Sequence, residues 1–153
     1  MLKSKIIFLL YICFSGLMHA VEDPVMLETW RKELANQANV DLSDRGLTNL
    51  EAQAIAKALV DNSSLIVLNL SMNNIGDEGG MSIVEALKNN ATLQALDLSH
   101  NTDIGKKTAA ALKNILEANK SLRTLMLNNT QISGAELSDI NRLVIRNEKA
   151  LDR

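Results

Sequence analysis

Apolar residues recur along this chain in a fixed order, once every 28 or 29 residues. In each period, two apolar positions lie two residues apart, the separation of side chains on one face of a strand. A third apolar position follows five or six residues later. The three sets are Val40, Leu68, Leu96 and Leu125, then Leu42, Leu70, Leu98 and Leu127, then Leu47, Ile75, Ile104 and Ile132. The pattern predicts four short strands, which start near Gln37, Leu65, Leu93 and Leu122.

The second half of each period has helical spacing. Apolar residues fall at i, i+3 and i+4, which places them on one face of a helix. They are Ile55, Ala58 and Leu59, then Ile83, Ala86 and Leu87, then Leu112, Ile115 and Leu116, then Ile140, Leu143 and Val144. An asparagine follows each group, at Asn62, Asn90, Asn119 and Asn147. Because asparagine tolerates the left-handed conformation, we expect it to end each helix as a C-cap.

Each period therefore predicts one strand, one turn and one helix. Neither element can bury its apolar face alone, so the units must stack side by side around a shared core. The strands then form a parallel sheet on the concave side. The helices are wider than the strands, so they cover the convex side and bend the stack into an arc.

The repeat also resembles a known family. "LxxLxLxxNxIG" at 65–76 and "NxTL" at 90–93 are similar to the ribonuclease-inhibitor-like class of leucine-rich repeats, over residues 37–151. The resemblance implies an α/β fold, a right-handed curved solenoid of about four strand–turn–helix repeats that binds protein partners. Asn73 and Asn101 fit the asparagine position of the family, whereas Arg45 and Thr130 depart from it. We therefore expect looser first and fourth turns.

The segments beside the repeats predict capping elements. Asp23-Pro24 is a typical helix start, and Leu27, Trp30 and Leu34 then share one helical face. We expect an N-terminal cap helix within residues 21–36, with Trp30 in the core. The repeat domain then covers residues 37–153. Its last helix, from about 134 to 146, is expected to serve as a polar cap, with Asp139, Arg142 and Arg146 on its outer side.

The first twenty residues predict a secretory signal peptide. Two lysines precede an apolar run of 13 residues, Ile6 to Met18, which is too short to span a bilayer. Ala20 supplies a small residue for cleavage, so we expect a secreted or periplasmic protein. An uncleaved anchor is the alternative. Lipidation at Cys13 is disfavoured by the bulky Ile12 before it.

The composition of the chain argues against some classes of binding partner. The 153 residues carry a formal net charge of −2 and contain no Lys/Arg-rich block, which argues against nucleic acid or an anionic membrane as partner. Aromatic residues make up 3%, so the core must be aliphatic. The only cysteine lies in the predicted signal, so the exported domain would be stabilised by packing alone.

The sequence offers little catalytic chemistry. His100 is the only histidine after the signal, and a Ser-His-Asp set would need Ser71 or Ser99 with Asp97 on the exposed concave face. A metal site built from Asp41, Asp44, Asp97 and His100 is interrupted by Asn69 and Met72. The glycine-rich run 76–80 lacks the P-loop lysine. We therefore predict no catalytic residues, no metal and no cofactor.

Five N-glycosylation sequons begin at Asn62, Asn69, Asn90, Asn119 and Asn128. Three of them coincide with the asparagine that recurs after each helix, so the repeat alone explains their presence. The signal and the lack of other cysteines look bacterial, and we expect the asparagines to be unmodified.

The outward strand positions vary between repeats, so binding specificity is expected there. The candidate partner-binding residues are Asp41, Asp44, Asn69, Met72, Asp97, His100, Arg123, Met126 and Asn129. The sequence predicts an exported module that binds a protein partner through this concave face, without catalysis. Two alternatives are a regulator of a host or bacterial enzyme, by analogy with the GTPase-activating member of this repeat class, and an exported scaffold that self-associates through its C-terminal end.

Overall fold

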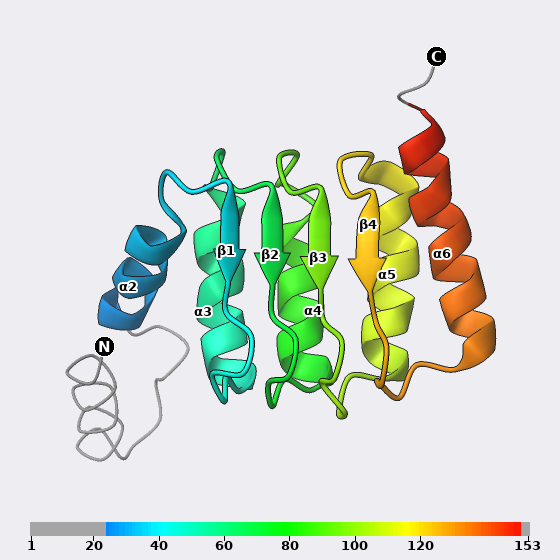
Figure 1. Cartoon of the computed structure of the whole chain (residues 1–153), viewed down its shortest axis with the longest axis horizontal. Helices are drawn as coiled ribbons and strands as arrows, with labels where there is room; N and C mark the ends of the chain where they lie inside the picture. The colour runs from blue at the N-terminus through cyan, green and yellow to red at the C-terminus, as the bar shows by residue number, and fades with distance from the viewer. Residues whose placement is uncertain (1–23, 151–153) are drawn as a thin grey trace.

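The computed structural model describes residues 24–150, which form alternating helices and strands (Figure 1). The predicted signal, residues 1–20, lies outside the described residues. The elements are α2 (Pro24–Leu34), β1 (Asn39–Asp41), α3 (Asn49–Val60), β2 (Val67–Asn69), α4 (Asp77–Ala86), β3 (Ala95–Asp97), α5 (Lys106–Ala118), β4 (Thr124–Met126) and α6 (Gly134–Lys149). Residues 37–64, 65–92, 93–121 and 122–150 are called repeats one to four below.

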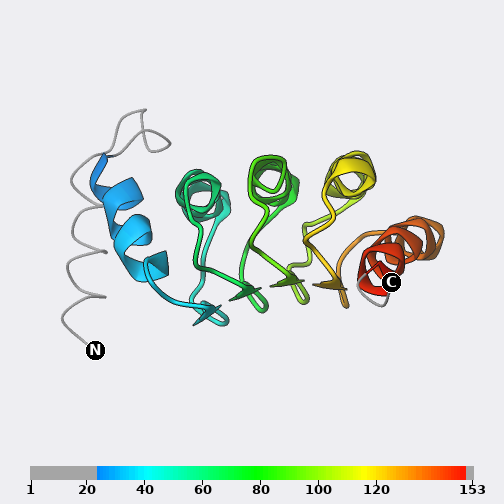
Figure 2. The same cartoon turned by 90° about the horizontal axis from the view of Figure 1, so that it is seen from above.

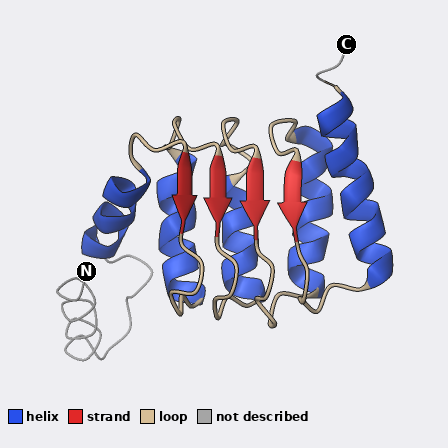
Figure 3. Cartoon of the chain, in the orientation of Figure 1, coloured by secondary structure: helices blue, strands red, loops and turns tan. Residues whose placement is uncertain are grey.

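The four strands form one parallel sheet in the order β1-β2-β3-β4. Helices α3, α4 and α5 cover one face of this sheet, and its other face is open (Figure 3). Seen from above, the strands follow an arc with the helices on its outer side (Figure 2). The predicted curved solenoid with a parallel concave sheet and convex helices is confirmed.

The predicted strand residues lie in register and point into the core. Leu68 pairs with Val40 and Leu96, and Leu96 pairs with Leu125. Leu70 and Leu98 have no exposed surface, and Leu127 is 5% exposed. The core is aliphatic apart from Trp30, which is 4% exposed and packs with Leu34 of α2. Each buried leucine contributes about 2 kcal/mol through the hydrophobic effect.

Two buried asparagines fasten the turns after the strands. Asn73 Nδ2 donates to the carbonyl oxygens of Leu42 and Leu70, and its Oδ1 accepts from the backbone N–H groups of Arg45 and Leu47. The backbone of the first turn is therefore hydrogen-bonded by Asn73 from repeat two. The turn is not loosened by the presence of Arg45 in place of the family asparagine. Asn101 fastens the second turn in the same way. Thr130 bonds only its own repeat, through the carbonyl oxygen of Leu127.

The asparagines after the helices also bridge repeats. Asn90 Nδ2 donates to the carbonyl oxygens of Leu59 and Asn62 in repeat one, and its Oδ1 accepts from the backbone N–H groups of Thr92 and Leu93. Asn119 and Asn147 donate equivalent inter-repeat bonds, and Asn62 donates to the carbonyl oxygen of Leu34 in the cap helix α2. The expected left-handed C-caps are wrong, because none of these residues has a positive φ. At all four positions the side-chain amide instead donates to backbone carbonyl oxygens, and at Asn62, Asn90 and Asn119 its oxygen also accepts from backbone N–H groups.

Two helices are capped by the repeat before them. Asn49 Oδ1 accepts from the N–H groups of Gly76 and Gly79 at the start of α4. Asp77 plays the same role for α5, where it accepts from the N–H groups of Gly105, Lys107 and Thr108. The equivalent residue in repeat three is Lys106, which has no acceptor to offer. Helix α6 caps itself through Ser133 and Glu136.

Helices α2 and α6 flank the stack at its two ends (Figure 2). In α6, Asp139 pairs with Lys113 of α5 at 2.8 Å, and Arg146 lies 3.4 Å from Glu117 of α5. The prediction that Asp139 and Arg146 line the outer side is therefore wrong, because both face the preceding helix. No helix of the described residues is long and apolar enough to cross a membrane.

Candidate functional site

The concave face of the sheet carries the predicted site residues in aligned rows. The strand register places Asp41, Asn69, Asp97 and Met126 side by side, one at the end of each strand. A second row follows three residues later and consists of Asp44, Met72, His100 and Asn129. Parallel strands lie about 4.8 Å apart, so each row spans the sheet in about 14 Å. Arg123 immediately precedes β4, so it lies at the opposite end of that strand and is not brought together with these rows.

Three residues of the first row accept the same hydrogen bond from the backbone just after their strand. The Oδ1 atoms of Asp41, Asn69 and Asp97 accept from the backbone N–H groups two residues later, at 2.9, 3.0 and 2.8 Å. The hydroxyl and backbone N–H of Ser43 hold the pKa of Asp41 below its ordinary value. The Asp41 carboxylate therefore remains ionised at neutral pH.

The second row has an unusual backbone. Asp44, Met72, His100 and Asn129 all adopt positive φ, from 52 to 61°. This left-handed conformation suits Asp and Asn but costs most other residues about 1–2 kcal/mol. Met72 is also 55% exposed, so an apolar side chain is displayed on a strained turn. This row was predicted to lie on the strands, although Asp and Asn at two of its four positions favour a left-handed turn.

Ser71 and Ser99 do not lie on an exposed polar surface as expected. Ser71 is 7% exposed and Ser99 is 5% exposed, and Ser99 Oγ accepts from the backbone N–H of Asn128. The ring of His100 instead contacts the side-chain amide of Asn129 at 3.1 Å. Ser71, Ser99 and His100 therefore do not assemble into a Ser-His-Asp arrangement.

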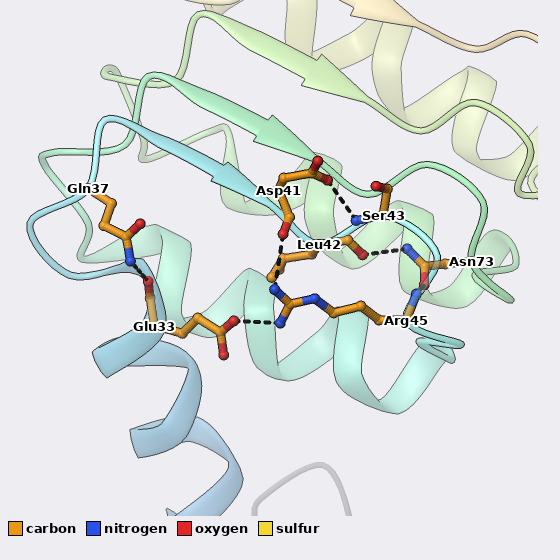
Figure 4. Close-up of polar contacts among 7 residues, drawn as sticks. All are labelled: Glu33, Gln37, Asp41, Leu42, Ser43, Arg45 and Asn73. Atoms are coloured by element: carbon orange, nitrogen blue, oxygen red, sulfur yellow. Dashed lines mark hydrogen bonds and ion pairs between the residues drawn. The ribbon is translucent and has the colours of Figure 1, made fainter. Parts of the chain in front are cut away.

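The first turn of the concave face is tied to the cap helix by Arg45 (Figure 4). Its guanidinium forms an ion pair with Glu33, at the C-terminal end of α2, and donates to the backbone carbonyl oxygen of Asp41. Arg45 is the residue that replaces the family asparagine. Its side chain thus connects α2 to the edge of the candidate site.

The described residues offer little support for a metal site or a phosphate site. Between residues 24 and 150, no group of three or more His, Cys, Asp and Glu side chains is arranged to hold a metal ion. In the glycine-rich run 76–80, the N–H groups of Gly76 and Gly79 are already bonded to Asn49. A phosphate would have to displace that side chain.

Comparison with known proteins agrees with this geometry. Residues 61–84 and 89–113 match the family described as Leucine Rich repeat. The chain belongs to the leucine-rich repeat proteins. It is 32% identical over 88 residues to the Ribonuclease inhibitor of Mus musculus, a match that covers 58% of this chain and 19% of that protein.

Two further similarities agree with this leucine-rich repeat assignment. The chain is 30% identical over 105 residues to the Photoactivated adenylate cyclase subunit alpha of Euglena gracilis, which covers 69% of this chain. The chain spans only 10% of the length of that relative. The solved structure of Leiomodin-1 Actin-Binding Site 2 superposes with a TM-score of 0.73 at 22% identity, covering 90% of this chain and 79% of that one. That likeness shows the fold alone.

Proposed function

We propose that this leucine-rich repeat chain is an exported module that holds a protein partner on its concave face and catalyses no reaction. The observation that carries the proposal is the display of Met72 and Met126, which are 55% and 42% exposed on the open side of the sheet. Methionine adapts its shape to a partner surface. The surrounding positions vary between repeats while the buried positions stay aliphatic.

The comparisons support protein binding as the class of function. Ribonuclease inhibitor and Leiomodin-1 Actin-Binding Site 2 both carry names that describe binding to another protein. The concave residues here differ from one repeat to the next, so they set a partner preference particular to this chain. The proposed export rests on residues 1–20, and the expected mature N-terminus is Val21. Edman sequencing of the protein recovered from its native cells tests the cleavage.

The binding proposal is tested by exchanging the displayed apolar side chains. Met72→Ser combined with Met126→Ser is compared with Val60→Ser combined with Ile145→Ser, two residues of the helices that are 38% and 45% exposed. Tagged proteins are recovered from the native compartment, and their partners are quantified by mass spectrometry. We expect the concave variant to lose a partner that the wild type and the control retain. Equal retention by all three would exclude the concave face as the binding site.

A further inference from the structure

The fold does not use the negative charges on the concave face. Asp41, Asn69 and Asp97 make the same strand-ending hydrogen bond, at 2.9, 3.0 and 2.8 Å. Asn69 makes it with a neutral amide oxygen. The turn therefore needs an acceptor at this position but no charge, and the charges of Asp41 and Asp97 are available for another role.

Asp44 also has a neutral counterpart. It adopts a left-handed conformation with φ 52°, and Asn129 adopts the same conformation with φ 54° in repeat four. The backbone again accepts a residue without charge. All three acidic residues of the concave rows thus occupy positions where this chain itself uses asparagine.

These three carboxylates have no direct ion-pair partner among the described residues, although the Arg45 guanidinium contributes to the lowered pKa of Asp41. Within residues 24–150, none of the ion pairs includes Asp41, Asp44 or Asp97. Arg45 directs its guanidinium to Glu33 and to the backbone oxygen of Asp41 (Figure 4). Arg123 is half-buried and lies 3.4 Å from Gln94. The open face therefore presents negative charge to a partner.

Apolar surface lies between and beside these charges. Met72 follows β2, lies in the second row between Asp44 and His100, and is 55% exposed. Met126 ends β4 and is 42% exposed. Repeat two, which carries Asn69 in place of an aspartate, therefore supplies an apolar centre between the acidic residues of repeats one and three.

We infer that the concave face binds a segment of its protein partner in which basic residues alternate with aliphatic ones. The inference rests on the proposed function and specifies its partner. Asp41 and Asp97 lie two strands apart, or about 9.6 Å. A polyproline II segment has three residues per turn and rises about 3.1 Å per residue, so its residues i and i+3 share a face at about 9.3 Å. Lysine or arginine at i and i+3 meets Asp41 and Asp97, and an aliphatic side chain between them contacts the apolar centre.

Fluorescent peptides test the chemistry directly. The probe is a peptide of about twelve residues built from Lys-Pro-Leu units, long enough to cross all four strands. Peptides of Glu-Pro-Leu and Lys-Pro-Ser units serve as charge and apolar controls. Fluorescence anisotropy with the folded chain is expected to show binding of the Lys-Pro-Leu peptide, weakened as salt is raised, and much weaker binding of both controls. Absence of binding by the Lys-Pro-Leu peptide, or equal binding of the Glu-Pro-Leu peptide, overturns the inference.

Asn69 and Asn129 show that asparagine is tolerated at these positions, which suggests a variant that removes the charges. Asp41→Asn, Asp44→Asn and Asp97→Asn together keep each turn and remove three charges. The matched control removes three exposed charges from the helices, through Glu78→Gln, Glu85→Gln and Glu148→Gln. We expect the concave variant to bind the Lys-Pro-Leu peptide about tenfold more weakly and the control to bind it as the wild type does. Equal weakening by both variants would reduce the effect to net charge and overturn the inference.

The same variants separate the two proposals. If the partner recovered from native cells is lost with the Met72→Ser and Met126→Ser variant but retained by the triple asparagine variant, protein binding stands and the basic segment is excluded. If both variants retain the partner, the concave site and the inference fail together. Unfolding curves for each variant confirm that binding is compared between folded proteins.

Discussion

The carboxylate of Asp77, in repeat two, accepts a 2.7 Å hydrogen bond from the hydroxyl of Thr108, in the first turn of α5 in repeat three. The same carboxylate accepts from the backbone N–H groups of Gly105 and Thr108 at 2.9 and 3.0 Å. One side chain thus replaces the N-cap that Gly105 cannot provide. Neighbouring repeats are thereby joined by helix capping as well as by their shared core.

Replacement of Asp77 is expected to destabilise the chain. Asp77→Ala removes the cap of α5 and should lower the free energy of unfolding by about 1–2 kcal/mol. Asp77→Asn keeps an acceptor, as Asn49 does for α4, and should cost less. Urea unfolding followed by circular dichroism measures both. Identical losses for the two variants would contradict a capping role for the side chain.

The Asp77 carboxylate also predicts a pH dependence. Burial raises its pKa, but the hydrogen bonds from the Thr108 hydroxyl and the backbone N–H groups of Gly105, Thr108 and Lys107 outweigh burial and leave the pKa below its ordinary value. A depressed pKa contributes stability that is complete above the unfolded pKa of about 4 and is lost as pH falls through the folded pKa. The stability of Asp77→Asn should therefore change less than that of wild type between neutral pH and about pH 3.

The left-handed turn at Met72 predicts a reciprocal pair of variants. Met72→Asn should raise the free energy of unfolding by about 1 kcal/mol, because asparagine tolerates positive φ better than methionine. Asn129→Met places methionine in the same conformation and should lower it by a similar amount. Denaturant midpoints measure both changes. A gain in stability at position 72 with a loss of partner would identify the strained methionine as a functional residue.

Buried Asn90 should be far more sensitive than its neighbour. Asn90→Ala leaves the carbonyl oxygens of Leu59 and Asn62 and the N–H groups of Thr92 and Leu93 without their partner, so we expect a loss of about 3 kcal/mol or more. Asn89 is exposed and one residue away. Asn89→Ala should cost less than about 0.5 kcal/mol. Similar losses at both positions would show that the inter-repeat amide bonds contribute little.

The displayed methionines should be the first to oxidise. Met72 and Met126 are exposed, whereas Met26 and Met81 are half-buried. Under dilute hydrogen peroxide we expect methionine sulfoxide to form several-fold faster at Met72 and Met126. Peptide mass spectrometry over time measures the rates. A bound partner that covers the concave face should protect these two residues selectively.

The sequence predicted the repeat well because its apolar spacing reports burial directly. Leu70, Leu98 and Leu127 were placed in the core from their period alone, and all three are buried. Spacing says nothing about hydrogen-bond partners in a neighbouring repeat. Asn90 was therefore interpreted within its own helix, whereas the structure bonds both Asn90 and Asp77 across repeats.

The candidate site was predicted in outline. The strand register that aligns Asp41, Asn69, Asp97 and Met126 followed from the repeat period. The burial of Ser71 and Ser99 could not be predicted by alternation, because the strands end at Asn69 and Asp97 and the chain then turns. Whether these rows bind a partner remains a prediction that the experiments above test.

Repeat three is joined to repeat four without two of the side-chain links that join the earlier repeats. Lys106 stands where Asn49 and Asp77 cap the next helix, and Thr130 stands where Asn73 and Asn101 bond the preceding turn. In their place, partly exposed ion pairs join α5 to α6, and such contacts weaken in salt. The solenoid is consequently held together less firmly before its last unit, where high ionic strength should let residues 122–150 exchange their amide hydrogens before repeats one to three do.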